Sequence, residues 1–409
     1  MNRARLALVG VGGFGARHVA CARRLAAEGL ADIAAFAEPR SDLPAARELE
    51  ASGARAYVSF EELLAKETAL DLVCVATPIH THVPIAAAVF DRGLHVFLEK
   101  PPAVRIQDLR RLIELAERRK IYCAVGFHDM ARPEIIALKR RLCEGKIGHV
   151  RSIRGHARWR RTDRYYTRAP WAGRVCFDGA YVLDGPMNNS CAHMLNMAAY
   201  LAGGDLHEFA RPLWVQGELY RAAPVQGEDT NCIRAGMDTG VEVCIHLTQA
   251  ASQTHPRVLR IIGDKGEAVY HDEDGVRLPD EKLTPAVSEP PTGRLIRRLI
   301  EVIHGTDEPL LMPLAESVSF LLMSNGAYES AEEILAIPKE YVRETRTEQG
   351  LGWVISDIET AMEQAAFEGQ LLSEYGMPWA RHTSPFDLAG YTEFPQQWQS
   401  PCGPAGTPQ

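Results

Sequence analysis

The sequence predicts an α/β domain built on a doubly wound parallel sheet, followed by an α+β domain built on a mostly antiparallel sheet. Three observations predict this fold class. A short apolar run, Leu6–Val9, leads into a glycine-rich turn. Apolar runs of strand length then alternate with helical patterns over about the first 125 residues. Beyond them, segments of alternating polarity are joined by short turns, which is typical of antiparallel sheets.

The glycine-rich turn carries Gly10, Gly12 and Gly15 in the spacing G-x-G-x-x-G, between an apolar strand and a helical pattern. A dinucleotide-binding fingerprint requires this context. The first glycine makes the tight turn, the second lets the backbone approach a pyrophosphate, and the third lets the helix pack on the strand. Free N–H groups at the start of the helix would face the anion, so we expect Gly13 and Phe14 to line the same site.

The first half of the chain alternates strands with helices, and an open parallel sheet of this kind binds ligands at the carboxyl ends of its strands. Two boundaries between these elements are marked in the sequence. The first helical pattern ends at Gly29, and a proline in the turn after residue 76 ends the strand before it. The predicted strands are 5–10, 33–37, a short strand near Tyr57, 71–76, 94–98 and 122–126; the predicted helices are 14–28, 43–52, 60–67, one ending near 92, and 106–119.

Polar side chains follow the ends of these strands. Glu38 ends the second strand, where an acidic residue can accept both ribose hydroxyls of NAD and repel the extra phosphate of NADP. We therefore expect NAD rather than NADP. Arg40 weakens this preference, because a guanidinium two residues further on could bind a 2′-phosphate. The alternative is that Glu38 is an exposed loop acid. The predicted cofactor-binding residues at strand ends are Glu38, Arg40, Thr77, Pro78, His80, His82, Glu99, Lys100 and His128.

These motifs resemble the Gfo/Idh/MocA oxidoreductase family. The resemblance rests on the fingerprint, on Thr77-Pro78 with His82 behind it, and on the element Glu99-Lys100-Pro101, which is its most specific part. It spans roughly residues 5 to 340 and includes 145–148 and 327–330. The resemblance implies a nicotinamide-binding Rossmann domain and an α+β domain whose large, open, mostly antiparallel sheet covers the active site and often builds oligomers. We therefore expect a homo-oligomer, a dimer or a tetramer.

Lys100 is the strongest catalytic candidate, because two prolines fix its backbone at a strand end and a partly buried lysine can act in proton transfer. The resemblance implies that it lies beside the nicotinamide and the reacting carbinol. The alternative is a surface lysine that pairs with Glu99.

His193 and Asn189 form the second candidate pair, since residues four apart share one helix face. Many family members carry D-x-x-x-H here, with the histidine as acid/base. This sequence keeps the histidine but has Asn189 for the aspartate, so we expect Asn189 to orient a substrate hydroxyl while Lys100 and His193 share the proton. The alternative is a histidine of the core.

A second departure from the family pattern lies after the last predicted strand of the first half, where His128 and Met130 stand in the places that the family often fills with asparagine and arginine.

The second half is predicted as one substrate-binding and oligomerisation domain. We expect a Rossmann domain at 1–127, the α+β domain at 128–375 and an irregular C-terminal arm at 376–409 that lies on the surface or on a partner subunit. Predicted strands are 150–159, 213–220, 232–237, 241–247, 257–263 and 267–271; predicted helices are 132–144, one from 192, 293–304, 313–334 and 348–367.

An arginine-rich stretch stands out in a chain of net charge −8. Eight arginines lie between residues 151 and 174 with aromatic residues among them. Aromatic rings can stack on a sugar and an arginine can bind a carboxylate or phosphate, which predicts Arg158, Trp159 and Trp171 as substrate-binding residues. The alternative, equally weighted, is a subunit interface or a solvated face that pairs with acids elsewhere.

The bulk composition is that of an ordinary soluble protein, with 46% hydrophobic and 24% charged residues. The net negative charge argues against nucleic acid, and no apolar run is long enough for a membrane span. Nine scattered cysteines without C-x-x-C predict reduced thiols and a cytoplasmic location. The histidines lack metal-ligand spacing, so no metal is expected.

Three functions remain open. The first is an NAD-dependent dehydrogenase that acts on a secondary alcohol of a sugar, cyclitol or sugar acid. The second is an NAD-dependent glycosidase or lyase that uses transient oxidation. The third is a non-catalytic NAD-sensing protein, which the departures at Met130 and Asn189 motivate.

Overall fold

The computed structural model describes residues 3–285 and 289–402, which form two compact units. The described part of unit 1 comprises 3–103, 107–132 and 289–317; that of unit 2 comprises 104–106, 133–285 and 318–402. The segment 289–317 thus belongs to unit 1, although it follows most of unit 2 in sequence. The predicted domain boundaries at 127 and 375 stay predictions.

Unit 1 is built on a six-stranded sheet in the order β3-β2-β1-β4-β5-β6, and all its pairs are parallel. The order reverses direction between β1 and β4, so right-handed connections place helices on both faces. This confirms the predicted doubly wound sheet. The strands are β1 (Ala4–Val9), β2 (Ala31–Ala37), β3 (Arg55–Tyr57), β4 (Leu72–Val75), β5 (His95–Leu98) and β6 (Cys123–Val125).

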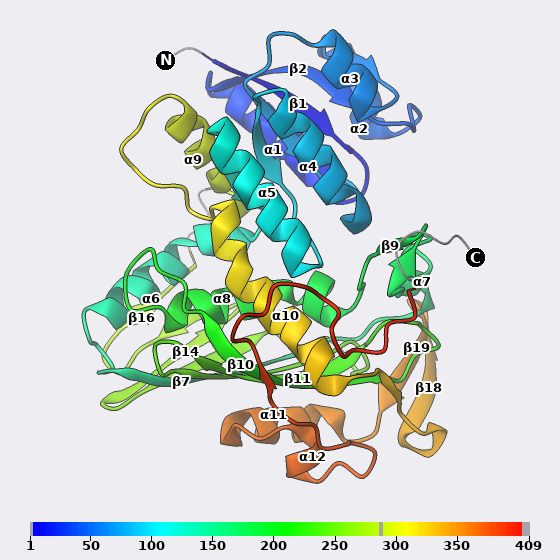
Figure 1. Cartoon of the computed structure of the whole chain (residues 1–409), viewed down its shortest axis with the longest axis vertical. Coiled ribbons are helices and arrows are strands. Elements are labelled where there is room, and N and C mark those ends of the chain that lie inside the picture. The colour runs from blue at the N-terminus through cyan, green and yellow to red at the C-terminus, as the bar shows by residue number, and fades with distance from the viewer. Residues whose placement is uncertain (1–2, 286–288, 403–409) are drawn as a thin grey trace. The chain divides into compact units, whose positions relative to one another are not determined.

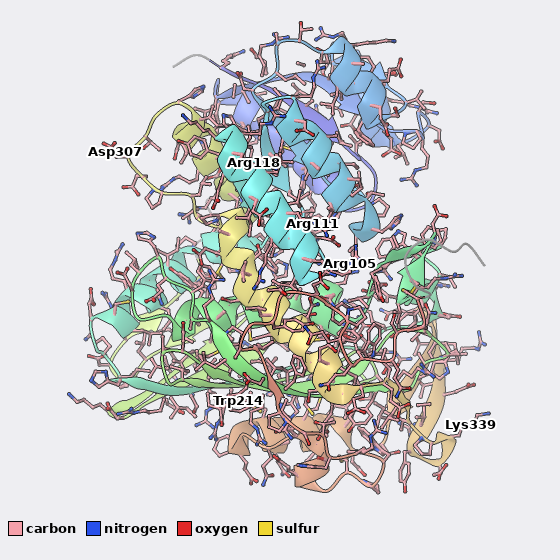
Figure 2. The ribbon with its side chains drawn as sticks, viewed as in Figure 1. Arg105, Arg111, Arg118, Trp214, Asp307 and Lys339 are labelled. Atoms are coloured by element: carbon pink, nitrogen blue, oxygen red, sulfur yellow. A yellow bond between two sulfur atoms is a disulfide. The ribbon has the colours of Figure 1, made fainter. Side chains whose placement is uncertain are left out.

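The helices of unit 1 follow from amphipathic patterns. In α5, Arg111 and Arg118 are seven residues apart and project from its exposed side (Figure 2). The late helix α9 packs against α1 and against β5 and the edge strand β6, which is why its segment belongs to this unit. The helices are α1 (Gly15–Ala27), α2 (Pro44–Ala51), α3 (Phe60–Lys66), α4 (His82–Asp91), α5 (Ile106–Arg119) and α9 (Pro291–Ile303).

Unit 2 is built on a ten-stranded sheet in the order β16-β15-β14-β13-β7-β12-β11-β10-β17, with β20 also on β10. The pairs β7–β12 and β10–β17 are parallel and the others antiparallel, as predicted. The strands are β7 (Val150–Arg158), β10 (Pro212–Arg221), β11 (Thr230–Met237), β12 (Glu242–Thr248), β13 (Val258–Gly263), β14 (Gly266–His271), β15 (Gly275–Arg277), β16 (Lys282–Leu283), β17 (Leu335–Ala336) and β20 (Phe386–Asp387).

Helices cover both faces of this sheet (Figure 1). Alternation along β7 explains how: Gly155 faces Met194 of α8, while Arg154 on the other face donates to the Phe367 carbonyl of α11 at 2.6 Å. The helices of unit 2 are α6 (Pro133–Cys143), α7 (Asp163–Tyr166), α8 (Ala192–Ala202), α10 (Ser317–Ala331), α11 (Ile358–Glu368) and α12 (Leu372–Tyr375).

The helix predicted over 348–367 is wrong in its first part. A hairpin of β18 (Val342–Thr347) and β19 (Gly350–Ile355) precedes α11. Gly350 has φ +116°, which a helix does not allow, and the left-handed Asp357 starts α11 afresh. The sequence also did not predict a small two-stranded sheet, which consists of β8 (Cys176–Phe177) and β9 (Ala180–Tyr181).

The described part of the C-terminal arm, 376–402, is largely irregular but folds onto its own unit. Glu329 of α10 accepts hydrogen bonds from the backbone N–H groups of Gln396, Gln397 and Trp398 and from the Tyr391 hydroxyl, at 2.7–2.9 Å. The arm runs alongside α10 in Figure 1. Tyr391 and Trp398 are buried, so this part of the arm completes the core of unit 2. The predicted surface placement is corrected for these residues.

Two cysteines far apart in sequence meet in the fold. Cys176 of β8 forms a disulfide with Cys402 of the arm, with a Cα–Cα distance of 5.8 Å. The expectation that every thiol is reduced is therefore wrong for this pair, since spacing along the sequence does not show which cysteines the fold brings together. The other seven are free thiols. Within the described residues, none of the helices is sufficiently long and apolar to cross a membrane.

Candidate functional site

The glycine-rich loop of unit 1 has the tight geometry that its spacing predicts. Gly10 has φ +82°, and a Cβ there would lie 2.6 Å from the Ala76 carbonyl oxygen. A Cβ on Gly15 would collide with the Gly10 carbonyl oxygen. The loop therefore packs β1, α1 and the end of β4 at a distance that only glycine allows.

The start of α1 offers donors for an anion. Among the residues that the structure describes, no acceptor pairs with the backbone N–H of Gly13 or Phe14. A Cβ at Gly13 would meet nothing within 4 Å, so the space beside the loop is open. These features fit the pyrophosphate of a dinucleotide at a helix N-terminus.

Glu38 follows β2 and turns back onto the glycine loop. Its carboxylate accepts the Val11 N–H at 3.1 Å and the Gly12 N–H at 3.3 Å, and its side chain is only 5% exposed. Arg40 pairs with the same carboxylate at 3.3 Å, and its guanidinium lies against Gly12. Both residues thus stand at the loop that would carry the cofactor ribose.

His82 links the ends of two strands. Its Nδ1 lies 2.8 Å from the Pro101 carbonyl oxygen and its Nε2 lies 2.8 Å from the Thr77 carbonyl oxygen. Burial lowers the pKa of His82, against the opposing effect of those two hydrogen bonds. His82 is buried, so it holds the loops after β4 and β5 together rather than facing solvent.

Glu99 is held from two sides at the end of β5. Its carboxylate lies 2.9 Å from Nε2 of the buried His18 and accepts the Lys100 N–H at 3.0 Å. A Cβ on Gly126 would lie 2.7 Å from Glu99, so that glycine makes room for it. Burial raises the pKa of Glu99, but the His18 hydrogen bond and the positive charges nearby outweigh it, and the net pKa is lowered.

Lys100 therefore stands at the carboxyl edge of the parallel sheet, next to an anchored carboxylate. His128 lies at the same edge, after β6, and its ring stacks on Phe14 of the glycine loop at a centroid distance of 6.5 Å. Its neighbour Asp129 is fully buried and accepts Arg132 Nε at 2.9 Å. The predicted cofactor-binding residues of unit 1 thus gather along this edge.

In unit 2, Asn189 and His193 do not share one helix. Asn189 lies in a π-helical turn, Pro186–Ser190, whereas His193 is the second residue of α8. The premise of a common helix face is wrong, because Cys191 interrupts the helix between them. His193 is 5% exposed.

Asp184 organises the surroundings of Asn189. One carboxylate oxygen accepts the Asn189 side-chain amide at 2.6 Å, and the other accepts the Gly173 N–H at 2.7 Å. Arg168 pairs with the same carboxylate at 3.0 Å. A single buried acid therefore fixes the amide of Asn189 and two positions of the arginine-rich stretch.

Three predicted substrate residues lie in different settings. Arg158 donates to the Glu359 carbonyl at 2.9 Å and to Glu363 at 2.7 Å, so it joins β7 to α11. The guanidinium of Arg161 covers Trp159, and that of Arg168 covers Trp171 at 4.9 Å. Ion pairs with acidic residues thus account for some arginines of the arginine-rich stretch. Contact of Arg158, Trp159 and Trp171 with a substrate stays a prediction.

Two further acids are buried beside Asp184. Burial raises the pKa of Glu228 well above its usual range, and the charges of Asp184 and Asp229 add to the effect. Burial likewise raises the pKa of Asp229 to about 6. Within the described part of the chain, no donor reaches Glu228 Oε2.

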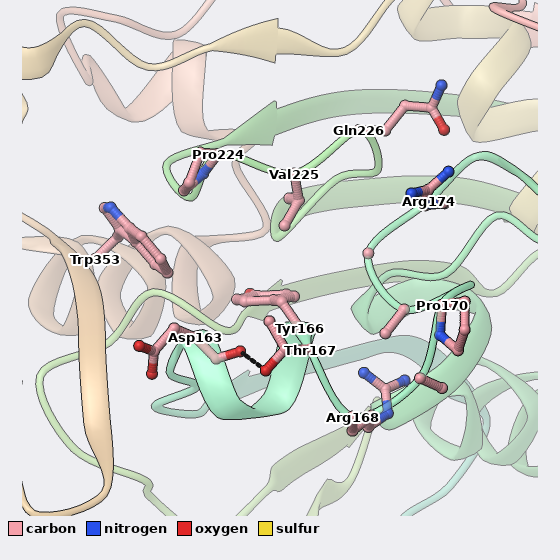
Figure 3. A pocket seen from close by; sticks show the side chains of 13 residues that line it. Asp163, Tyr166, Thr167, Arg168, Pro170, Arg174, Pro224, Val225, Gln226 and Trp353 are labelled. Atoms are coloured by element: carbon pink, nitrogen blue, oxygen red, sulfur yellow. Dashed lines mark hydrogen bonds between the residues drawn. The ribbon is translucent and has the colours of Figure 1, made fainter.

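An open cavity of about 800 Å³ lies beside this cluster, wholly within unit 2 (Figure 3). Tyr166 and Trp353 form its aromatic wall, with ring centroids 6.4 Å apart. Arg168, Arg174 and Gln226 also line it. Of these residues, only those of the arginine-rich stretch could be singled out from the sequence, because Gln226, between β10 and β11, and Trp353, in β19, are distant in the chain.

His18 and Asp184 were also missed. His18 lies in α1, where the local pattern indicates only a helix, and its partner Glu99 follows β5, far away in sequence. The clustering of Asp184 with the arginines is visible in sequence, but the hydrogen bond to Asn189 is not.

Known proteins resemble parts of this chain. The rhizopine catabolism protein MocA of Rhizobium meliloti is 34% identical over 151 residues, 37% of this chain and 45% of that protein. Inositol 2-dehydrogenase of Corynebacterium glutamicum is 30% identical over 166 residues, 40% of this chain and 48% of that protein. The matched stretches thus span about half the length of these relatives.

The fold is also that of a solved dehydrogenase. The crystal structure of WlbA from Bordetella pertussis, in complex with NADH and UDP-GlcNAcA, aligns with a TM-score of 0.69 at 22% identity, covering 81% of this chain and 97% of that one. Residues 4–127 match the oxidoreductase family with an NAD-binding Rossmann fold, and residues 135–269 match the GFO/IDH/MocA C-terminal domain. The chain belongs to the Gfo/Idh/MocA oxidoreductase family.

Proposed function

We propose that the protein is an NAD-dependent dehydrogenase that acts on a secondary alcohol of a sugar, cyclitol or sugar acid. The observation that carries the proposal is the position of Lys100. It follows β5 at the same sheet edge as the glycine loop, beside the Glu99–His18 pair. Relatives named as sugar or inositol dehydrogenases support the substrate class.

The glycine loop fits the cofactor through its open N–H groups at Gly13 and Phe14. A nicotinamide cofactor bound there would supply the acceptor for the hydride of the carbinol carbon. Lys100 would take the hydroxyl proton, and the buried carboxylate of Glu99, which accepts the Lys100 backbone N–H, would hold the backbone from which the lysine side chain extends. His193 shares this proton transfer, and Asn189, oriented by Asp184, hydrogen-bonds the substrate.

The test is turnover of a polyol panel by the purified protein with NAD, followed by the absorbance of NADH. Lys100→Met is expected to lower turnover at least 100-fold, because general acid–base groups contribute about 10²–10⁴ in rate. Its NAD affinity, measured by fluorescence titration, should stay within about twofold.

The matched control is Lys66→Met, in which the lost lysine of unit 1 is exposed, pairs with Glu62 of its own helix and lies over the Tyr57 ring. It should keep full turnover. Unchanged turnover in Lys100→Met would overturn the assignment of the proton to that residue.

A further inference from the structure

We propose that the cavity between Tyr166, Arg174 and Trp353 is a subsite for an anionic group of the substrate, a carboxylate or a phosphate carried by the sugar. This inference rests on the proposed function, because it names the class of substrate. The true substrate would then be a sugar acid or a sugar phosphate rather than a neutral polyol. The argument has three steps: a stacking wall, a cationic wall, and a connection to Asn189.

The stacking wall consists of Tyr166 and Trp353. The Tyr166 hydroxyl donates to Gln249 at 2.9 Å, and Trp353 Nε1 donates to Glu344 at 3.3 Å. Because both polar atoms are bonded away from the cavity, the two residues offer it their apolar ring surfaces. Such faces accept the C–H surface of a sugar ring.

The cationic wall lies toward the other side of the cavity in Figure 3. Arg174 is exposed, and among the described residues no carboxylate pairs with it. Gln226 uses its side-chain oxygen for the N–H groups of Val175 and Cys176, at 2.9 and 3.2 Å, which leaves its amide nitrogen as a donor. A guanidinium and an amide at one wall suit an oxyanion.

The acid that lines the same cavity, Asp163, has one carboxylate oxygen occupied by backbone donors. Asp163 accepts the Arg164 N–H at 2.8 Å and the Leu351 N–H at 3.0 Å through one oxygen. Arg168 also lines the cavity, but its charge is paired with Asp184. Arg174 is therefore the cation available to a ligand, and Arg168 serves mainly to join the cavity to Asp184.

That connection reaches the candidate catalytic residues. Asp184 binds Arg168 and Gly173 on the cavity side and Asn189 on the other. A sugar held by its anion at Arg174 would lie against a wall whose position fixes the Asn189 amide. The carboxylate of Asp184 would thus fix both the wall of the occupied cavity and the amide that orients the substrate hydroxyl.

The volume also fits. About 800 Å³ lies within the range of pockets for small organic ligands and exceeds what one unsubstituted hexose fills. A substituted or charged sugar uses that space, whereas a small neutral polyol leaves the arginine unbonded.

The experiment measures binding and turnover separately. Glucuronate, glucose 6-phosphate and glucose are titrated into the full-length protein with NAD, by calorimetry and by ligand-detected NMR, and each is then assayed for NADH formation. At least one charged probe is expected to bind about tenfold more tightly than glucose, with affinity that falls as salt rises. The two charged probes distinguish a carboxylate from a phosphate.

Arg174→Gln is expected to remove that tenfold preference and to leave glucose binding unchanged. Arg164→Gln is the matched control: it removes an exposed arginine of the same stretch that does not line the cavity. Trp353→Leu should weaken charged and neutral sugars alike.

Equal binding of charged and neutral probes, or equal effects of the two arginine variants, would overturn the inference even if a polyol is oxidised. Conversely, an Arg174-dependent preference without NADH formation from any sugar would uphold the subsite and contradict the proposed dehydrogenase.

Discussion

Asp184 places a buried carboxylate next to Asn189, the position at which many family members have an aspartate. The family's usual carboxylate is an asparagine here, and Asp184 supplies a charge one hydrogen bond away. An amide held at 2.6 Å from a carboxylate has one N–H committed, so its oxygen is turned to a fixed direction. Asn189 can thus orient a hydroxyl without titrating.

Glu38 and Arg40 share one ion pair at the glycine loop, and we propose that these two residues set the choice between NAD and NADP. Glu38→Gln keeps an oxygen for the Val11 and Gly12 N–H groups but removes the charge that repels a 2′-phosphate. We expect the ratio of NADP to NAD affinity to rise about tenfold, which corresponds to about 1.4 kcal/mol. Fluorescence titration with both cofactors at one ionic strength measures it.

Arg40→Gln is the converse variant and should weaken NADP binding while leaving NAD binding nearly unchanged. If neither substitution moves the ratio, Glu38 serves only to brace the loop through its two backbone contacts.

At the scale of elements, the contact between β1 and α1 is set by glycine. A Cβ on Gly15 would clash with the Gly10 carbonyl. A Cβ on Gly13 would meet open space, so the only penalty there is that of holding alanine in the left-handed backbone conformation, φ +54°. We expect Gly15→Ala to destabilise unit 1 by about 2–3 kcal/mol and Gly13→Ala by about 1 kcal/mol. Thermal unfolding of both variants checks this order; a reversed order would contradict it.

The sequence predicts elements well where the pattern is local. Alternation along 150–159 and apolar runs in the first half identify β7 and the parallel strands, and strand ends locate Glu38, Glu99 and Lys100. It fails where distant segments decide the structure. The β18–β19 hairpin includes the first part of the stretch predicted as a helix, and the Glu99–His18 contact joins the end of a strand to a helix 81 residues away.

The same limit appears at the scale of the whole molecule. The disulfide closes a separation of 226 residues, and the arm reaches Glu329 from a segment that reads as irregular. Neither contact follows from spacing or periodicity. The candidate site has the same character: its strand-end residues are predictable, while the walls of the cavity come from three segments that are distant in sequence.

The stability of the molecule should depend on pH through the buried acids of unit 2. A carboxyl whose pKa is raised by folding binds its proton more tightly in the native state, so stability is greatest below the ordinary pKa and falls as pH rises toward the native value. This applies to Glu228, raised well above 4.5, and to Asp229, raised from 3.8 to about 6.

Glu228→Gln keeps an acceptor for the Met187 N–H, 3.2 Å away in the native protein, and removes the buried charge. We expect the variant to gain stability relative to wild type as pH rises from about 5 to about 8, by at most 1.4 kcal/mol per pH unit. The difference in thermal midpoint across a pH series measures it, with the exposed Glu368→Gln as control. A pH-independent difference would mean that Glu228 ionises in the folded protein as it does in the unfolded chain, and that the unbonded oxygen carries no penalty.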